Sequence, residues 1–186
     1  MNIFFLHNDP VLAAQFLVDV HVGSHNCGGK MIIESAQMLA NCYNADQLGH
    51  FSCPRTQSGN VRSYSYFNHP CSVWVRQSLS NFNWLVSHAQ EMVKEKQYRG
   101  GNLHFSSLFI DWCSITRPNL PDIGPTTPAL AMKNFESLKD EGDPVGSYQM
   151  FYVVDKRFDK NGKPMDIYTK RNRPQFWNEF SYLKDM

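Results

Sequence analysis

Hydrophobic side chains recur along the chain at the three- and four-residue spacing of amphipathic helices. The clearest pattern begins at His69 and continues for about 30 residues. Its core-facing positions are Val75, Leu79, Phe82, Val86, Ala89 and Val93. A second set is rotated from the first by about 100° and comprises Trp74, Ser78, Asn81, Leu85 and His88. We expect the first set to face the core, and the second to lie at a cleft or against another helix.

Aspartate–proline pairs predict two further helix starts, because aspartate caps a helix and proline suits its first turn. These pairs are Asp9-Pro10 and Asp143-Pro144, and the helices after them should cover 10–22 and 144–160. Apolar spacing predicts additional helices over 30–45 and 103–113. No long alternating β-branched run appears, so we predict a single all-α domain of about four to six helices.

The remaining segments indicate loops. Residues 49–68 are polar, and residues 116–128 contain four prolines, so both should be long and irregular. Asn161-Gly162 predicts a turn. Residues 161–186 form a basic and aromatic C-terminal segment that we expect to pack on the domain.

Composition limits the function classes. The 186 residues are 42% hydrophobic, which suits one domain with a sizeable core. A net charge of +1 provides no overall attraction to nucleic acids or membranes. No apolar run approaches the roughly 18 residues of a membrane span, and the first residues do not resemble a signal peptide. Five cysteines without tight spacing favour reduced thiols, so we expect a cytoplasmic protein without a membrane partner.

The C-terminal segment is the first candidate for nucleic-acid binding. Lys170, Arg171 and Arg173 lie close in sequence to Trp177. Cations neutralise phosphates, and aromatic rings stack on unpaired bases. The alternative is a segment pinned to the domain by its rings, with solvated charges.

The helix that starts at His69 is the second candidate. Trp74 could stack on a base, while Arg76 and Asn81 could reach a phosphate or a base edge. Core packing explains Trp74 equally well, and His69 could simply cap the helix.

A polar stripe on the first two predicted helices is a candidate for acid–base chemistry. It includes Gln15, Asp19, His21, Lys30 and Glu34. Carboxylates beside a histidine and a lysine can transfer protons at a glycosidic bond. An ordinary i, i+4 ion pair between Lys30 and Glu34 is the alternative.

Histidines and cysteines also raise the question of a metal. The candidates are His21, His25, Cys27, His50, Cys53, His69 and Cys71. They include no CxxC pair, which structural zinc sites favour. We therefore predict no cofactor and keep a zinc-stabilised binding module as an alternative.

Several motifs in order resemble the phage pyrimidine-dimer DNA glycosylase/AP lyase family of the endonuclease V type. They are Leu12-Ala13-Ala14-Gln15, His69 followed by Trp74 and Phe82, and Arg173-Pro174-Gln175-Phe176-Trp177. Most of the chain also resembles phage proteins without an assigned activity, through the D-x-H-V, K-M-I-x-E-x-A-Q, H-P-x-x-x-W and R-P-x-x-W patterns.

The glycosylase resemblance implies a small all-α enzyme whose N-terminal α-amine attacks C1′ of a damaged nucleotide and forms a Schiff base. An α-amine suits this role because its ordinary pKa is near 7.7–8.0. The sequence departs from the family at two places. Asn2 is too large for routine removal of the initiator methionine, so the amine would belong to Met1. The family's glutamate position falls near Gly23, so Asp19 or Glu34 would have to replace it.

Our hypothesis from the sequence is a phage DNA-processing enzyme, acting in the infected host's cytoplasm on a nucleobase or its N-glycosidic bond. Met1, Asp19, His21 and Glu34 would be catalytic. The residues expected to bind DNA are Gln15, Lys30, His69, Trp74, Arg76, Asn81, Lys170, Arg171, Arg173 and Trp177. A DNA base hypermodification transferase and a non-catalytic DNA- or protein-binding module remain alternatives.

Overall fold

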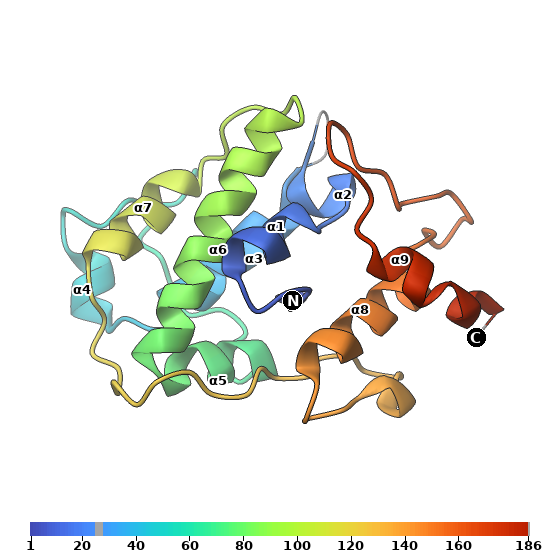
Figure 1. Cartoon of the computed structure of the whole chain (residues 1–186). Helices are drawn as coiled ribbons and strands as arrows, with labels where there is room; N and C mark the ends of the chain where they lie inside the picture. Colours follow the sequence, from blue (N-terminus) through green and yellow to red (C-terminus); the bar gives the residue numbers. More distant parts are fainter. Residues whose placement is uncertain (25–27, 186) are drawn as a thin grey trace.

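The computed structural model describes residues 1–24 and 28–185, and all regular structure in these residues is helical (Figure 1). This confirms the all-α class. In chain order the elements are α1 (Pro10–Gln15), α2 (Asp19–Val22), α3 (Lys30–Ala40), α4 (Ala45–Gly49), α5 (Pro70–Gln77), α6 (Leu79–Tyr98), α7 (Ser107–Ile115), the 3-10 helix η1 (Glu136–Leu138), α8 (Pro144–Asp155), α9 (Phe176–Glu179) and the 3-10 helix η2 (Ser181–Asp185).

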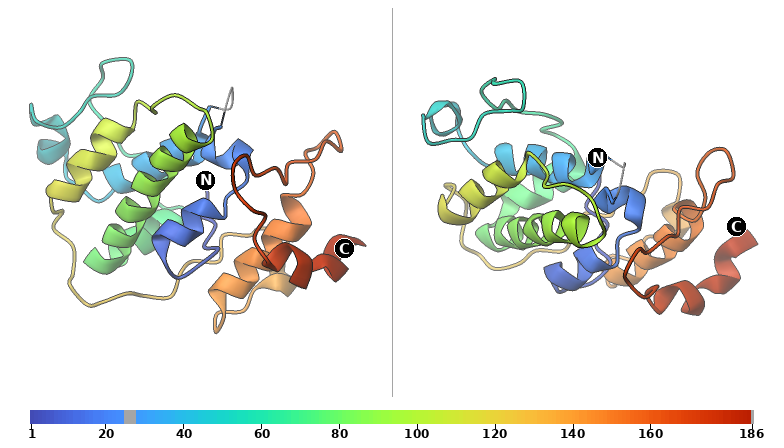
Figure 2. Two further views of the ribbon diagram at one scale, coloured as in Figure 1. Left: turned by 45° about the horizontal axis from the view of Figure 1, so that its top comes forward. Right: turned by 90° about the horizontal axis from the view of Figure 1, so that it is seen from above.

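Helix α6 is the centre of the fold, and α1, α3, α5 and α7 all pack against it (Figures 1 and 2). The stripe predicted to face the core is buried along its whole length. The neighbouring stripe is buried too, which fits the expected position against another helix and not the one at a cleft. The reason is that α1 covers this side of α6, where the carbonyl oxygen of Pro10 lies 3.0 Å from Nδ1 of His88.

The long helix expected after His69 is divided in two at Ser78. Its backbone is extended at φ −152° and ψ 158°, and its hydroxyl accepts the N–H of Asn81 at 3.1 Å, which caps α6. The N–H of Leu79 is donated to the carbonyl of Pro121 at 2.8 Å. Serine is a favoured N-cap residue, and the cap at Ser78 starts a new helix instead of allowing α5 to continue. His69 caps α5 with its ring nitrogen, as the sequence suggested.

The helix expected over 10–22 is also divided, which raises the helix number above the expected range. Val18 is extended and donates its N–H to the Tyr152 hydroxyl at 3.1 Å. The N–H of Asp19 is donated to the carbonyl of Ile167 at 2.9 Å. Contacts with α8 and the C-terminal segment therefore satisfy the main-chain groups that a continuous helix would pair internally.

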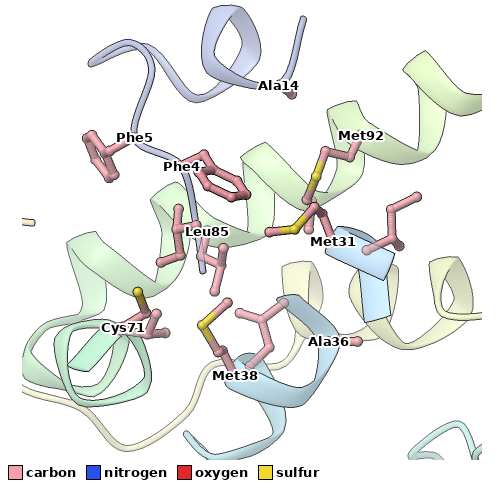
Figure 3. Packing of buried hydrophobic residues seen from close by; sticks show 14 of the residues in the cluster. Phe4, Phe5, Ala14, Met31, Ala36, Met38, Cys71, Leu85 and Met92 are labelled. Carbon is pink, nitrogen blue, oxygen red and sulfur yellow. The ribbon is translucent and has the colours of Figure 1, made fainter. Parts of the chain in front are cut away.

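The first residues of the chain are part of the core. Ile3, Phe4, Phe5 and Leu6 are buried, and Gln149 of α8 donates its side-chain N–H to the carbonyl of Leu6 at 2.9 Å. Figure 3 shows the rings of Phe4 and Phe5 among side chains of α3 and α6, including Met31, Leu85 and Met92. This placement brings the amino end of the chain to the middle of the molecule (Figure 1).

The C-terminal half completes the fold. Helices α9 and η2 pack on α8, and residues 156–173 form a long excursion with the predicted turn at Asn161-Gly162 (Figure 2). Residues 116–128 are irregular, as their prolines predicted. None of the described helices has the length and apolar character needed to cross a membrane.

Candidate active site

The amino group of Met1 lies 3.5 Å from Oε1 of Glu34. The Met1 side chain is only 1% exposed, and its sulfur accepts the hydroxyl of Ser72 at 3.5 Å. Met1 as a whole is half-buried, so its exposure comes mainly from main-chain atoms. A buried apolar side chain thus anchors an amine that faces outward beside a carboxylate.

The next residues fix this arrangement. The main-chain N–H of Asn2 is donated to Oε2 of Glu34 at 3.0 Å, so both carboxylate oxygens contact the first two residues. The Asn2 side chain donates to the carbonyl of Ala131 at 3.0 Å and accepts the N–H of Ile3 at 2.8 Å. Phe4 has a positive φ of 52°, which is uncommon for an aromatic residue. Strain of this kind concentrates at functional sites.

Two further basic groups lie around the carboxylate. Nζ of Lys30, one helical turn before Glu34, is 3.6 Å from Oε1 on a largely exposed side chain. His69, at the start of α5, is close enough for the charges of the Met1 amine and of Glu34 to shift its pKa. Partial burial lowers the His69 pKa, the positive amine of Met1 lowers it further, and Glu34 acts in the opposite direction. A neutral imidazole therefore borders the site at neutral pH.

His21 lies on the other side of this corner, but its ring is packed. It stacks on Phe4 with ring centroids 4.8 Å apart, and its Nδ1 lies 2.6 Å from the Tyr152 hydroxyl. Burial lowers the His21 pKa to about 3, with smaller contributions from Lys156 and Lys30. Its position supports Phe4 in the strained turn, and its neutral ring has no proton to donate as an acid near pH 7.

The predicted carboxylate Asp19 belongs to a different cluster. It accepts Nη1 of Arg99 at 3.1 Å and the hydroxyl of Thr169 at 2.6 Å. Arg99 is fully buried and also pairs with Glu95 at 2.9 Å. The polar stripe expected from the sequence is therefore split: Lys30 and Glu34 face the amine, whereas Asp19 joins α2 to the C-terminal segment. Gln15 donates to Glu91 at 2.9 Å, also away from Glu34.

The basic C-terminal segment is largely neutralised by the protein's own carboxylates. Arg171 pairs with Glu95, and Arg173 pairs with Asp166 while its guanidinium lies over the Trp177 ring. Trp177 is buried, and its indole N–H is donated to the Tyr168 hydroxyl at 2.7 Å. Because Trp177 is only 2% exposed, its ring cannot stack on a base as we expected. Lys170 is exposed near the Tyr98 ring.

The helix-borne candidates of α5 and α6 also have internal partners. Trp74 is buried and donates its indole N–H to the carbonyl of Thr126 at 3.1 Å. Asn81 is buried and donates to the carbonyl of Trp74 at 2.8 Å, so it cannot read a base edge. Arg76 donates to the carbonyl of Phe67 at 2.7 Å and remains partly exposed.

A cavity of about 410 Å³ lies along the same helix as Glu34. Ile33, next to Glu34, and Gln37, one turn later, both line it. Its other walls come from residues 56–65 and 104–106. The cavity and the carboxylate therefore share helix α3, but Met1 and Glu34 are not among the residues that line the cavity.

The sequence identified Met1, Lys30, Glu34 and His69 separately, and the structure brings them to one corner. The sequence did not identify Ser72, whose hydroxyl anchors the Met1 side chain. The only available signal was its position one turn after His69 on the same helix, which placed both near one end of the fold.

The candidate metal ligands do not assemble in the described residues. His25 and Cys27 lie outside the described part of the chain. Among the remaining residues, no three His, Cys, Asp or Glu side chains are grouped so as to hold a metal ion. Cys42, Cys53, Cys71 and Cys113 are buried free thiols, and burial raises the pKa of Cys71 to about 12.

Comparison of the chain with protein-family models, with curated proteins and with solved structures found no match.

Proposed function

We propose that this protein is a DNA-processing enzyme that acts at the N-glycosidic bond of a nucleotide, with the Met1 amine as nucleophile. The observation that supports this most is the amine held 3.5 Å from Glu34 by a buried methionine side chain. An amine placed beside a base is a recurring design for covalent catalysis through a Schiff base.

In the proposed reaction the amine nitrogen attacks C1′ and the bond between C1′ and the base breaks. The base leaves with the bonding electrons and takes up a proton. The new N–C1′ bond then becomes a protonated imine as the C1′–O4′ bond of the sugar ring breaks, and O4′ takes up a proton from water. Glu34 would accept the proton that the amine must lose, since its Oε1 lies 3.5 Å from the nitrogen. Lys30 would orient the carboxylate through their ion pair.

The direct test is borohydride trapping on duplexes that are UV-irradiated, abasic or base-modified. We expect a covalent protein–DNA adduct, which peptide mapping locates at Met1. Intact-mass measurement of the same sample shows whether Met1 carries a free amine. An adduct at Lys30 would instead assign the nucleophile to the side-chain amine, and no adduct and no base release on any substrate would exclude this reaction.

Glu34→Gln should reduce trapping by about 10²–10⁴-fold, the usual contribution of a proton-transfer group. Glu91→Gln is a matched control, because Glu91 has the same 11% side-chain exposure and a helical lysine partner, Lys94. A two-residue extension before Met1 should abolish trapping, since it displaces the amine from Glu34. Equal trapping by Glu34→Gln and Glu91→Gln would contradict a role for Glu34.

A further inference from the structure

The region from residue 47 to residue 90 contains no aspartate or glutamate. Its formal charges are three arginines, and none of them has a carboxylate at ion-pair distance in the described part of the chain. Arg55, Arg62 and Arg76 donate instead to the carbonyls of Gly49, Pro54 and Phe67. These hydrogen bonds orient the guanidiniums but leave their positive charges uncompensated.

Aromatic rings lie among these charges on the 49–69 loop. The Tyr64 and Phe67 rings are 5.3 Å apart, and the Arg76 guanidinium lies 3.4 Å over the Phe67 ring. Both rings are about half-exposed. The loop therefore presents two neighbouring tilted rings and a cation at the surface, an arrangement that suits nucleobases.

Tyr66 is the most unusual residue of this surface. Its side chain is 68% exposed, and its backbone has a positive φ of 50°. An aromatic residue in this conformation is strained, and an exposed ring brings little packing in return. A bound partner that covers the ring would account for both observations.

The 410 Å³ cavity adjoins this loop. Ile33, Tyr64 and Phe105 line it and are each more than 40% exposed, whereas hydroxyl and amide groups such as those of Thr56 and Gln37 provide polar contacts. Its volume is typical of small-ligand sites, which span about 300–1,000 Å³. Walls that are about half polar and half apolar suit a flat ring with hydrogen-bonding edges.

A chain of hydrogen bonds links the cavity to the side chain of Met1, the residue that carries the amine. Asn41 donates to the carbonyl of Ser65, which lines the cavity, at 2.8 Å and to the Ser72 hydroxyl at 3.3 Å. Ser72 in turn contacts the sulfur of Met1.

We propose that the 49–69 loop, with Arg76, is the DNA-binding surface of this protein and that it holds a single-stranded stretch. Phosphates lie at the three arginines, bases stack on Tyr64, Tyr66 and Phe67, and one unpaired base enters the cavity. The choice of DNA as the partner rests on the proposed function. The C-terminal segment, which the sequence favoured for this role, has its arginines paired with carboxylates.

The test is fluorescence anisotropy of a labelled, undamaged single strand titrated with the full chain at several salt concentrations. Tyr66→Asn should weaken binding about five- to 150-fold, the range for loss of one stacked base. Asparagine tolerates a positive φ, so this variant should fold. Arg55→Gln and Arg76→Gln should each reduce the slope of log affinity against log salt by about 0.7.

Arg117→Gln is the matched control, because Arg117 is exposed but paired with Asp122, and its affinity should equal that of the wild type. Unchanged affinity in Tyr66→Asn, Arg55→Gln and Arg76→Gln overturns the inference. So does a loss of affinity confined to Arg173→Gln, or binding through these residues only to phosphatidylserine vesicles.

Binding and chemistry are separable. Glu34→Gln should bind the undamaged strand as the wild type does. If no substrate is trapped but Tyr66→Asn still loses affinity, the proposed reaction fails and this surface stands. If trapping occurs and Tyr66→Asn binds normally, the reaction stands and this surface is wrong.

Discussion

The C-terminal segment and the 49–69 loop both place arginines beside aromatic rings, but the two sets of arginines have different partners. Arg171 and Arg173 pair with carboxylates, whereas Arg62 and Arg76 donate to main-chain carbonyls. A carboxylate cancels the charge, and a carbonyl only orients it. Basic and aromatic composition therefore does not identify a binding surface until the acidic neighbours are known.

The largest expected effect comes from breaking the buried cluster beneath the C-terminal segment. Arg99→Met leaves Asp19 and Glu95 buried without their shared partner, which should cost about 3–5 kcal/mol of the free energy of unfolding. Urea denaturation measures this change. Arg117→Met, which removes an exposed pair, should cost less than about 1 kcal/mol. Equal losses in the two variants would mean that the buried cluster is not structural.

Lowering the pH should reduce the stability of the protein through two buried histidines, His21 and His88, which lie outside the ion-paired C-terminal segment. Burial lowers the pKa of His21 to about 3 and that of His88 to about 4, from an ordinary 6.5. The unfolded chain therefore binds protons below pH 6.5 that the folded protein excludes, so stability is complete above this pH and falls as pH decreases. By pH 5 the loss should be about 2 kcal/mol for each imidazole.

The measurement is urea denaturation between pH 8 and pH 5 for the wild type and His88→Gln. The variant should show a shallower dependence, because one of the two buried imidazoles no longer titrates. Identical pH dependence in the two proteins would exclude His88 as a contributor.

Arg171→Gln tests a partly exposed contact of the same buried cluster. Glu95 keeps Arg99 as a partner in this variant, and the Arg171 side chain is 32% exposed, so solvent weakens the lost pair. We expect a cost of about 1–2 kcal/mol in the free energy of unfolding. A cost as large as that of Arg99→Met would show that Arg171 is the main partner of Glu95.

The smallest expected effect is a gain in stability. Lys170 has a positive φ of 59° and its carbonyl accepts the Tyr98 hydroxyl at 3.2 Å. Lys170→Asn should stabilise the protein by a few tenths of a kcal/mol, because asparagine tolerates this conformation. Its affinity for single-stranded DNA should remain that of the wild type. A marked loss of affinity would return the binding role to the C-terminal segment.

Local signals in the sequence predicted the helix starts at Pro10, Pro70 and Pro144 and the buried face of α6, since caps and spacing act within a few residues. The breaks at Val18 and Ser78 depend on carbonyls and hydroxyls that lie far away in sequence, such as those of Pro121 and Tyr152. Periodicity alone therefore overestimated helix lengths.

The candidate site was only partly predicted, again because some of its contacts depend on residues that lie far apart in sequence. Glu34 was chosen because it stands on a polar stripe with Lys30, and that pair is present at 3.6 Å. Its contact with the chain's first residue depends on Phe4, whose strained backbone no local pattern predicts. The stripe could equally have favoured Asp19, which tertiary packing directs to Arg99 instead.

The burial of residues 3–6 against α8 has a consequence for biosynthesis. Residues 3–6 are synthesised before α8, which provides a ring partner for Phe4 and an amide donor for the carbonyl of Leu6. A nascent polypeptide without α8 lacks these partners of residues 3–6, so the amine and Glu34 reach their final arrangement only after α8 has been made. Until then these phenylalanines are open to chaperones.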